Sequence, residues 1–176
     1  MTICTMVGCC FNCQFCSAKR TFKRHLSKEE LLGQVDFLIQ QGKKYGRSTD
    51  PMESQEFHVL YTRMGEPCAN IDNVIASIQE LIKRYPHVKI GMSTNGYKDG
   101  VYQFFDYPEI IPHIMMQFSV HATDDATRSK VLGMENNYAG FMDLAETSTY
   151  IKEFRKINPR MVSLNFILLE GIKYDF

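Results

Sequence analysis

Short apolar runs alternate with amphipathic stretches along the whole chain. The runs are continuously apolar rather than strictly alternating, which is typical of a parallel sheet covered by helices. Strands that alternate with helices in this way indicate repeated βαβ units and an α/β fold. We expect strands at residues 2–7, 57–62, 88–92, 114–120 and 161–169.

The first two helical segments have recognisable ends. Ser27 with Glu30 forms a capping-box pattern, and the apolar face that follows is expected to end at Gly42. For the next helix, Asp72 is the expected N-cap and Pro86 lies beyond the last turn. Both helices therefore fall between successive strands, as βαβ units require.

The remaining segments are less regular. A longer helix is expected at residues 138–156, closed at Asn158, and a short or irregular helix within residues 97–112. Residues 43–55 are polar and indicate a surface loop. Parallel strands present their functional loops at their carboxyl ends, so we expect any site to lie there.

Length and composition favour one domain over residues 1–176. Acidic and basic residues balance at 20 each, so the whole molecule carries no strong field toward nucleic acid or a membrane. No apolar run approaches the roughly 20 residues of a membrane span, and the N-terminus does not resemble a secretory signal. We therefore expect a cytoplasmic protein without membrane contacts, whose clustered thiols serve metal binding or catalysis rather than disulfides.

Four of the six cysteines fall within the segment GCCFNCQFCSAKR, residues 8–20. Cys9, Cys13 and Cys16 have the spacing C-x3-C-x2-C, so one loop can bring three thiolates to one metal centre. Structural zinc sites and four-iron clusters usually take four protein ligands. Three ligands suggest a centre that keeps one position open for another molecule. A structural metal site and a chance spacing are the alternatives.

The other cysteines are not expected to be ligands. Cys4 lies outside the spaced trio. Adjacent side chains point in different directions, so Cys10 is not expected to share a centre with Cys9. Cys68 stands alone and is most simply a small buried apolar residue.

The C-x3-C-x2-C spacing after a first strand, with Phe15 just before the last cysteine, resembles the signature of radical S-adenosylmethionine (radical SAM) enzymes. The resemblance implies a [4Fe-4S] cluster held by Cys9, Cys13 and Cys16, whose open iron chelates S-adenosylmethionine. It also implies an external electron donor, because one-electron reduction cleaves this cofactor to a 5′-deoxyadenosyl radical.

Four later segments extend the resemblance to one branch of that family. YTRMGEPCANIDNV (61–74) looks like its G-E-P loop, and GMSTNG (91–96) is similar to its S-T-S-G or S-T-N-G stretch. QFSVHATDDATRSKVLG (117–133) is similar to its S-L-H-A segment, and NFILLEGIKYD (165–175) resembles its fifth strand. The branch contains methyltransferases that modify adenine carbon-2 or carbon-8 of ribosomal RNA, and sometimes transfer RNA. The resemblance implies that the cofactor-binding residues are Phe15, Gly65, Glu66, Ser93, Ser119, Val120 and His121.

Basic residues directly follow the cysteines. Lys19, Arg20, Lys23 and Arg24 are candidates for contacts with RNA phosphates, which are strongly salt-dependent. A solvated polar face is the equally simple alternative.

The chain departs from the branch at both ends. The methyltransferases have an N-terminal accessory domain, and a methyl-carrying cysteine beyond the sixth strand, to which no residue here corresponds. The resemblance thus implies a partial (β/α)6 TIM-like barrel with about five strands, incomplete at its C-terminal end. An exposed edge strand would be open to pairing, so we expect a missing strand, a partner chain or a dimer to cover it.

Two other functions remain open from the sequence. The first is a minimal radical SAM enzyme that acts on a small molecule or a peptide. The second is a non-enzymatic metal-binding module, which fits least well because a structural site would need a further ligand.

Overall fold

The computed structural model describes residues 1–46, 51–52, 54, 57–135 and 138–175. A sheet of five parallel strands forms its centre, and the order of the strands in the sheet is their order along the chain. This order is that of a barrel wall, in which each strand is added beside the previous one. It confirms the expected α/β fold with five parallel strands. The strands are β1 (Thr2–Ile3), β4 (His58–Tyr61), β5 (Lys89–Thr94), β6 (Ile114–Ser119) and β7 (Ser163–Asn165).

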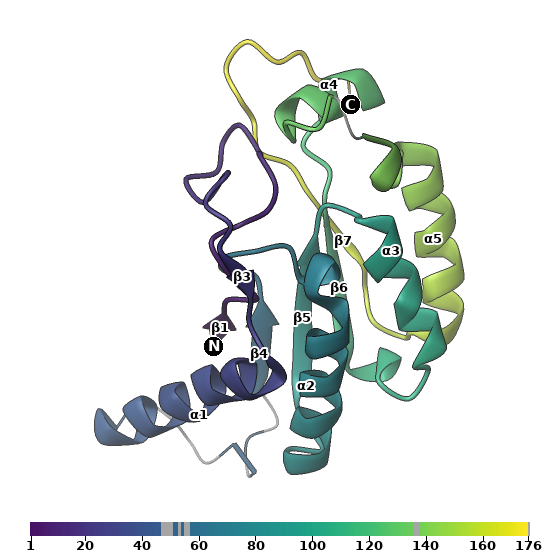
Figure 1. Ribbon diagram of the computed structural model, residues 1–176. Helices are drawn as coiled ribbons and strands as arrows, with labels where there is room; N and C mark the ends of the chain where they lie inside the picture. The colour runs from purple at the N-terminus through teal and green to yellow at the C-terminus, as the bar shows by residue number, and fades with distance from the viewer. Residues whose placement is uncertain (47–50, 53, 55–56, 136–137, 176) are drawn as a thin grey trace.

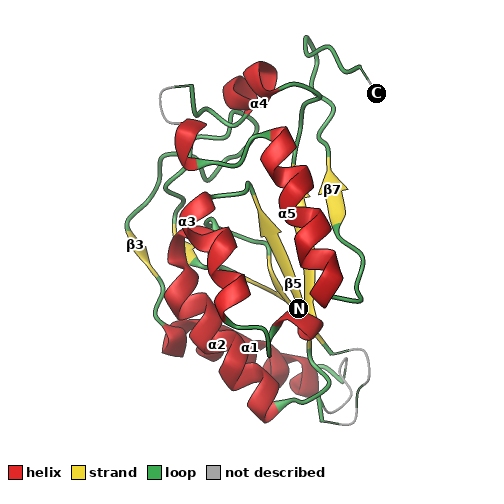
Figure 2. Ribbon diagram, turned by 90° about the vertical axis from the view of Figure 1, so that its right-hand side faces the viewer, coloured by secondary structure: helices red, strands yellow, loops and turns green. Residues whose placement is uncertain are grey.

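Helices cover one face of this sheet. Figures 1 and 2 both show α2, α3 and α5 packed on the same side, with the strands behind them in Figure 2. The α-helices are α1 (Lys28–Lys44), α2 (Ile71–Arg84), α3 (Lys98–Val101), α4 (Asp125–Val131) and α5 (Leu144–Ile157). Short 3-10 helices are η1 (Pro67–Asn70), η2 (Tyr102–Asp106), η3 (Ile111–His113) and η4 (Tyr138–Gly140). Among the described residues, none of the helices combines the length and apolar character needed to cross a membrane.

The main hydrophobic core lies between the strands and these helices. Ile90 of β5 and Phe118 of β6 are fully buried, as are Val74 and Ile78 of α2. Burying a side chain of this kind contributes about 1.5–3 kcal/mol each. This packing fixes the strands in place, and with them the loops at their carboxyl ends.

The capping box at the start of α1 is confirmed, but the end of that helix is not where we expected it. The Ser27 side chain accepts a hydrogen bond from the backbone N–H of Glu30, whose carboxylate accepts one from the backbone N–H of Ser27. The helix continues past Gly42 to Lys44, with Tyr45 as C-cap. A glycine is tolerated within a helix, and the tyrosine N–H completes the last turn by bonding to Gln41.

The N-cap of α2 is Asn70 rather than Asp72. The preceding η1 leads directly into the helix, and the Asn70 amide donates to the carbonyl oxygens of Thr5 and Leu26 instead of capping. Asp72 lies in the first turn, where its negative charge is favourable beside the helix N-terminus. Asn70 therefore ties the start of α2 to the segment that leads into the cysteines.

The long helix expected at residues 138–156 is interrupted. After η4, the chain turns inward at Met142, whose N–H donates to the Gly96 oxygen and whose carbonyl accepts from Arg128. These long-range contacts use the backbone groups that a continuous helix would need. Asp143 then caps α5, which ends at Ile157 with Asn158 as C-cap.

Other boundaries also differ from the sequence pattern. The opening strand is divided into β1 and β2 (Met6–Val7), and β2 pairs antiparallel with β3 (Arg24–His25). The last strand is shorter than expected, and α4 was not anticipated. The irregular helical segment within residues 97–112 is confirmed as α3, η2 and η3. The expected loop at residues 43–55 begins within α1, and residues 47–50, 53 and 55 lie outside the described residues.

Candidate functional site

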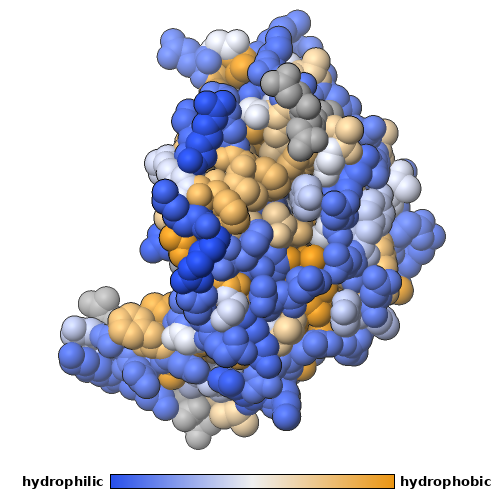
Figure 3. All heavy atoms as spheres, viewed as in Figure 1, coloured by the Kyte–Doolittle hydropathy of each residue, from blue (hydrophilic) through white to orange (hydrophobic). Residues whose placement is uncertain are grey.

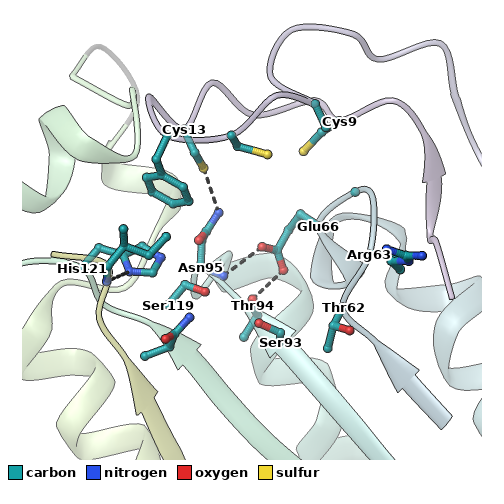
Figure 4. Close-up of a pocket in the computed structure, with 16 residues that line it drawn as sticks. Cys9, Cys13, Thr62, Arg63, Glu66, Ser93, Thr94, Asn95, Ser119 and His121 are labelled. Carbon is teal, nitrogen blue, oxygen red and sulfur yellow. Dashed lines mark hydrogen bonds between the residues drawn. The ribbon is translucent and has the colours of Figure 1, made fainter. Parts of the chain in front are cut away.

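A pocket of about 170 Å³ lies where the cysteine loop faces the carboxyl ends of the strands (Figure 4). The cysteine loop joins β2 to β3, and the opposite wall comes from segments at the ends of β4, β5, β6 and β7. Parallel strands make this gathering unavoidable, because their carboxyl ends meet at one edge of the sheet. Nine of the residues anticipated from the sequence line the pocket: Cys9, Cys13, Phe15, Cys16, Gly65, Glu66, Ser93, Ser119 and His121.

Backbone hydrogen bonds hold the cysteine loop over the pocket. The N–H of Cys16 donates to the Cys13 carbonyl at 3.0 Å, which forms a turn between the two thiols. The N–H of Gln14 donates to the Val131 carbonyl at the end of α4 at 2.9 Å. The loop is therefore anchored both internally and to α4.

The thiols of the adjacent residues Cys9 and Cys10 interact with each other. This contact is the main cause that lowers the pKa of Cys9 to about 6, and it raises the pKa of Cys10. Cys10 itself is exposed and is not among the residues that line the pocket.

Cys13 occupies the most buried position of the trio. Burial raises the pKa of its thiol to about 12, although the Asn95 side-chain amide, which donates to the sulfur at 3.5 Å, acts in the opposite direction. Cys68 is buried in the main core, as expected, and burial raises the pKa of its thiol. Within the described residues, no three His, Cys, Asp or Glu side chains converge closely enough to hold a single metal ion.

Glu66 places a buried carboxyl beneath the cysteine loop, with 4% of its surface exposed. Its oxygens accept hydrogen bonds from the Thr94 hydroxyl at 2.5 Å, the Asn95 N–H at 2.9 Å and the Cys68 N–H at 3.1 Å. Burial nevertheless raises the pKa of the carboxyl to about 7. Gly65 before it has a φ of 96°, and a Cβ there would come within 2.8 Å of Thr5 and Met6 side-chain atoms, so the turn requires glycine.

His121 is buried at the end of β6 in the left-handed backbone region, with a φ of 62°. Its Nδ1 accepts a hydrogen bond from the Ile167 N–H at 3.1 Å. Burial, followed by the nearby positive charge of Arg128, lowers the pKa of the imidazole to about 4. The ring is therefore neutral with its proton on Nε2, and it packs edge-on against the Phe15 ring at 4.7 Å between centroids.

Val120 is the one anticipated cofactor-binding residue that the structure does not bring to this pocket. Its side chain lies in the main core and lines a separate groove with Leu144 and Ile151.

Sequence reasoning also missed several residues that line the pocket. Thr62 and Arg63 directly follow β4, and Thr94 and Asn95 lie within the GMSTNG segment. The signal was available, since polar residues at the carboxyl end of a parallel strand are site candidates. The others are Ala18, Asn165 and Ile167.

The four basic residues after the cysteines are all exposed. Arg24 forms a two-pronged ion pair with Glu30, with N–O distances of 2.6 and 2.7 Å. Lys19 donates to the Gln14 carbonyl at 3.3 Å. Figure 3 shows apolar side chains gathered at the surface on the side of the cysteine loop, with hydrophilic residues around them.

Together, the five-stranded parallel wall and the thiol-lined pocket define a partial TIM-like α/β barrel whose candidate site lies at the carboxyl ends of the strands, where such barrels carry their active sites. A model of the Radical SAM superfamily matches residues 3–170, so the chain belongs to the radical SAM superfamily and is an enzyme of that type.

Curated relatives that resemble the chain carry a more specific name. "Probable dual-specificity RNA methyltransferase RlmN" of Trichormus variabilis is 29% identical over 98% of this chain and 45% of its own length. The protein of that name from Thermus thermophilus is 28% identical over 97% of this chain and 46% of its own. "Dual-specificity RNA methyltransferase RlmN" of Buchnera aphidicola is 26% identical over the full chain and 48% of its own. The chain therefore spans slightly less than half the length of these relatives.

Proposed function

We propose that the chain is the cluster- and cofactor-binding core of a radical SAM enzyme of the RNA adenine methyltransferase type. The observation that carries this proposal is the meeting of three thiols from one loop with a buried carboxyl and two serine hydroxyls in one pocket. The names of the relatives support the RNA methyltransferase type.

Cys9, Cys13 and Cys16 would hold the [4Fe-4S] cluster. Their donor chemistry fits, because thiolates are the usual ligands of such clusters and three of them leave one iron open. When bound, the cluster and S-adenosylmethionine supply the reductive cleavage of the cofactor's carbon–sulfur bond. The protein contributes binding, orientation and electrostatics.

The strand ends would hold the cofactor. The Glu66 carboxylate can accept charge-assisted hydrogen bonds from an ammonium group. The hydroxyls of Ser93 and Ser119 can bond to carboxylate or ribose oxygens, and the Nε2–H of His121 is a fixed donor toward the pocket. Phe15 packs against His121 and restricts the access of water at that side.

Iron binding tests the assignment of the cluster ligands. After anaerobic reconstitution with iron and sulfide, we expect about four irons per chain and the broad visible absorption of an iron–sulfur cluster. Each of the substitutions Cys9→Ser, Cys13→Ser and Cys16→Ser should reduce the iron content strongly, since each removes one thiolate. Cys10→Ser is the matched control, because it changes a neighbouring exposed cysteine and should retain the iron. A wild-type chain that binds no iron, or that does not cleave S-adenosylmethionine after its cluster has been reduced, would refute the proposal.

RNA binding separates the leading proposal from an enzyme for a small molecule or peptide. We expect the triple variant K19E/R20E/K23E to weaken binding to a short single-stranded adenine-containing RNA. The salt dependence of the remaining binding should also become shallower. The matched control is K152E/R155E/K156E, which reverses three exposed charges on α5. If both variants bind RNA like the wild type, these basic residues are a solvated face. That result would favour an enzyme that acts on a small molecule or a peptide.

A further inference from the structure

Asn95 contacts the most buried cysteine of the trio. It directly follows β5, and its side-chain Nδ2 donates to the Cys13 sulfur at 3.5 Å (Figure 4). Sulfur is a large acceptor, so this separation lies within the range of N–H···S hydrogen bonds. Among the described residues, this is the one side-chain hydrogen bond that the structure gives to Cys9, Cys13 or Cys16 from outside the cysteine loop.

The backbone of Asn95 is fixed from two sides. Its N–H donates to a Glu66 oxygen at 2.9 Å, and its carbonyl accepts from the buried guanidinium of Arg128 at 2.7 Å. The next residue is held as well, since the Gly96 N–H donates to the Thr94 hydroxyl at 3.0 Å. The Asn95 side chain therefore extends from a turn whose backbone is held by hydrogen bonds, and this turn directs it toward Cys13.

We propose that Asn95 is a positioning residue that raises the reduction potential of the cluster by donating a hydrogen bond to the Cys13 sulfur. The inference rests on the proposed function, because Cys13 must be a cluster ligand. An N–H donor withdraws electron density from a thiolate and stabilises the more negative, reduced form of the cluster. Asn95 also donates its backbone N–H to Glu66, the residue expected to bind the cofactor. Asn95 therefore connects the expected cluster ligand Cys13 to the cofactor side of the pocket.

The direct test is the midpoint potential of the reconstituted cluster in Asn95→Leu, measured by redox titration with electron paramagnetic resonance detection. Leucine is similar in size but cannot donate. At a fixed potential we expect the ratio of reduced to oxidised cluster to fall about threefold to tenfold, a tenfold change being 59 mV for one electron. Asn95→Asp should lower the ratio further, because it removes the donor and adds negative charge.

Asn165→Leu is the matched control. Asn165 lies at the end of β7, which β6 separates from β5 in the sheet, and it lines the same pocket. No side-chain hydrogen bond from it to a cysteine is found among the described residues. Its replacement should leave the potential close to that of the wild type.

The outcomes distinguish this inference from the proposed function. If the wild type takes up no cluster, the proposed function fails and this inference fails with it. If the wild type forms a cluster and Asn95→Leu has the same potential, only the role of Asn95 is refuted. Should the leucine variant fail to fold, Asn95→Ser serves instead, because its hydroxyl is too short to span the distance to Cys13. A serine variant with full iron content and an unchanged potential would equally refute the inference.

Discussion

A buried carboxyl such as that of Glu66 makes the stability of the fold depend on pH. Its pKa is about 7 in the folded chain against an ordinary value of 4.5, so the folded state binds more protons between these pH values. The free energy of unfolding should therefore fall as pH rises through this window, by an amount on the order of 3 kcal/mol at most. The Glu66→Gln side chain resembles the protonated carboxyl, so the free energy of unfolding of this variant should lack that dependence on pH. Urea unfolding at pH 5, 6, 7 and 8 measures it, and parallel curves for wild type and Glu66→Gln would contradict the prediction.

For individual residues, the sequence predicted which chemical groups form the site better than it predicted the contacts between them. Cysteine spacing and the G-E-P segment led to Cys9 and Glu66 because motifs are local in sequence. The hydrogen bond from Asn95 to Cys13 joins residues 82 positions apart, and no local pattern encodes it. The lowered pKa of His121 likewise comes from its burial and then from Arg128, both of which tertiary packing decides.

The capping box of α1 offers a test at the scale of elements. Ser27→Ala removes the acceptor for the Glu30 N–H, so it should destabilise the protein by about 1 kcal/mol. The control is Ser148→Ala on the exposed side of α5, where alanine should be neutral or slightly stabilising because of its helix propensity. The midpoint of urea unfolding should therefore fall for Ser27→Ala and should stay unchanged or rise slightly for Ser148→Ala. Equal shifts would show that the cap does not contribute.

Elements were predictable where a local pattern decides them and uncertain where distant contacts do. The start of α1 follows from Ser27 and Glu30 alone, and it was predicted correctly. The break before α5 depends on the contacts of Met142 with Gly96 and Arg128, which lie far away in sequence. Core strands β5 and β6 were found to within two residues at each end, since their apolar runs mark them locally.

On the scale of the whole molecule, the sheet order places β7 at one edge. Apolar side chains are exposed in and beside this strand, at Met161, Leu164 and Leu168. The groove between α5 and this region is also largely apolar, and Val120 and Phe166 contribute to it. An edge strand with apolar neighbours tends to pair with another chain.

The chain in the form described here should therefore self-associate through the β7 edge as its concentration rises. Leu164→Lys places a charge on that edge, where the leucine is 53% exposed, and should shift sedimentation toward the monomer. Phe37→Lys is the matched control, because Phe37 is 57% exposed on α1 and the change in net charge is the same. Analytical ultracentrifugation over a hundredfold range of concentration measures the effect. A wild type that stays monomeric throughout, or a Phe37 variant that dissociates as readily as the Leu164 variant, would show that β7 is not the contact. If the association does occur, pairing at β7 extends the barrel wall on the side of Asn165 and Ile167, and so borders the pocket that these residues line.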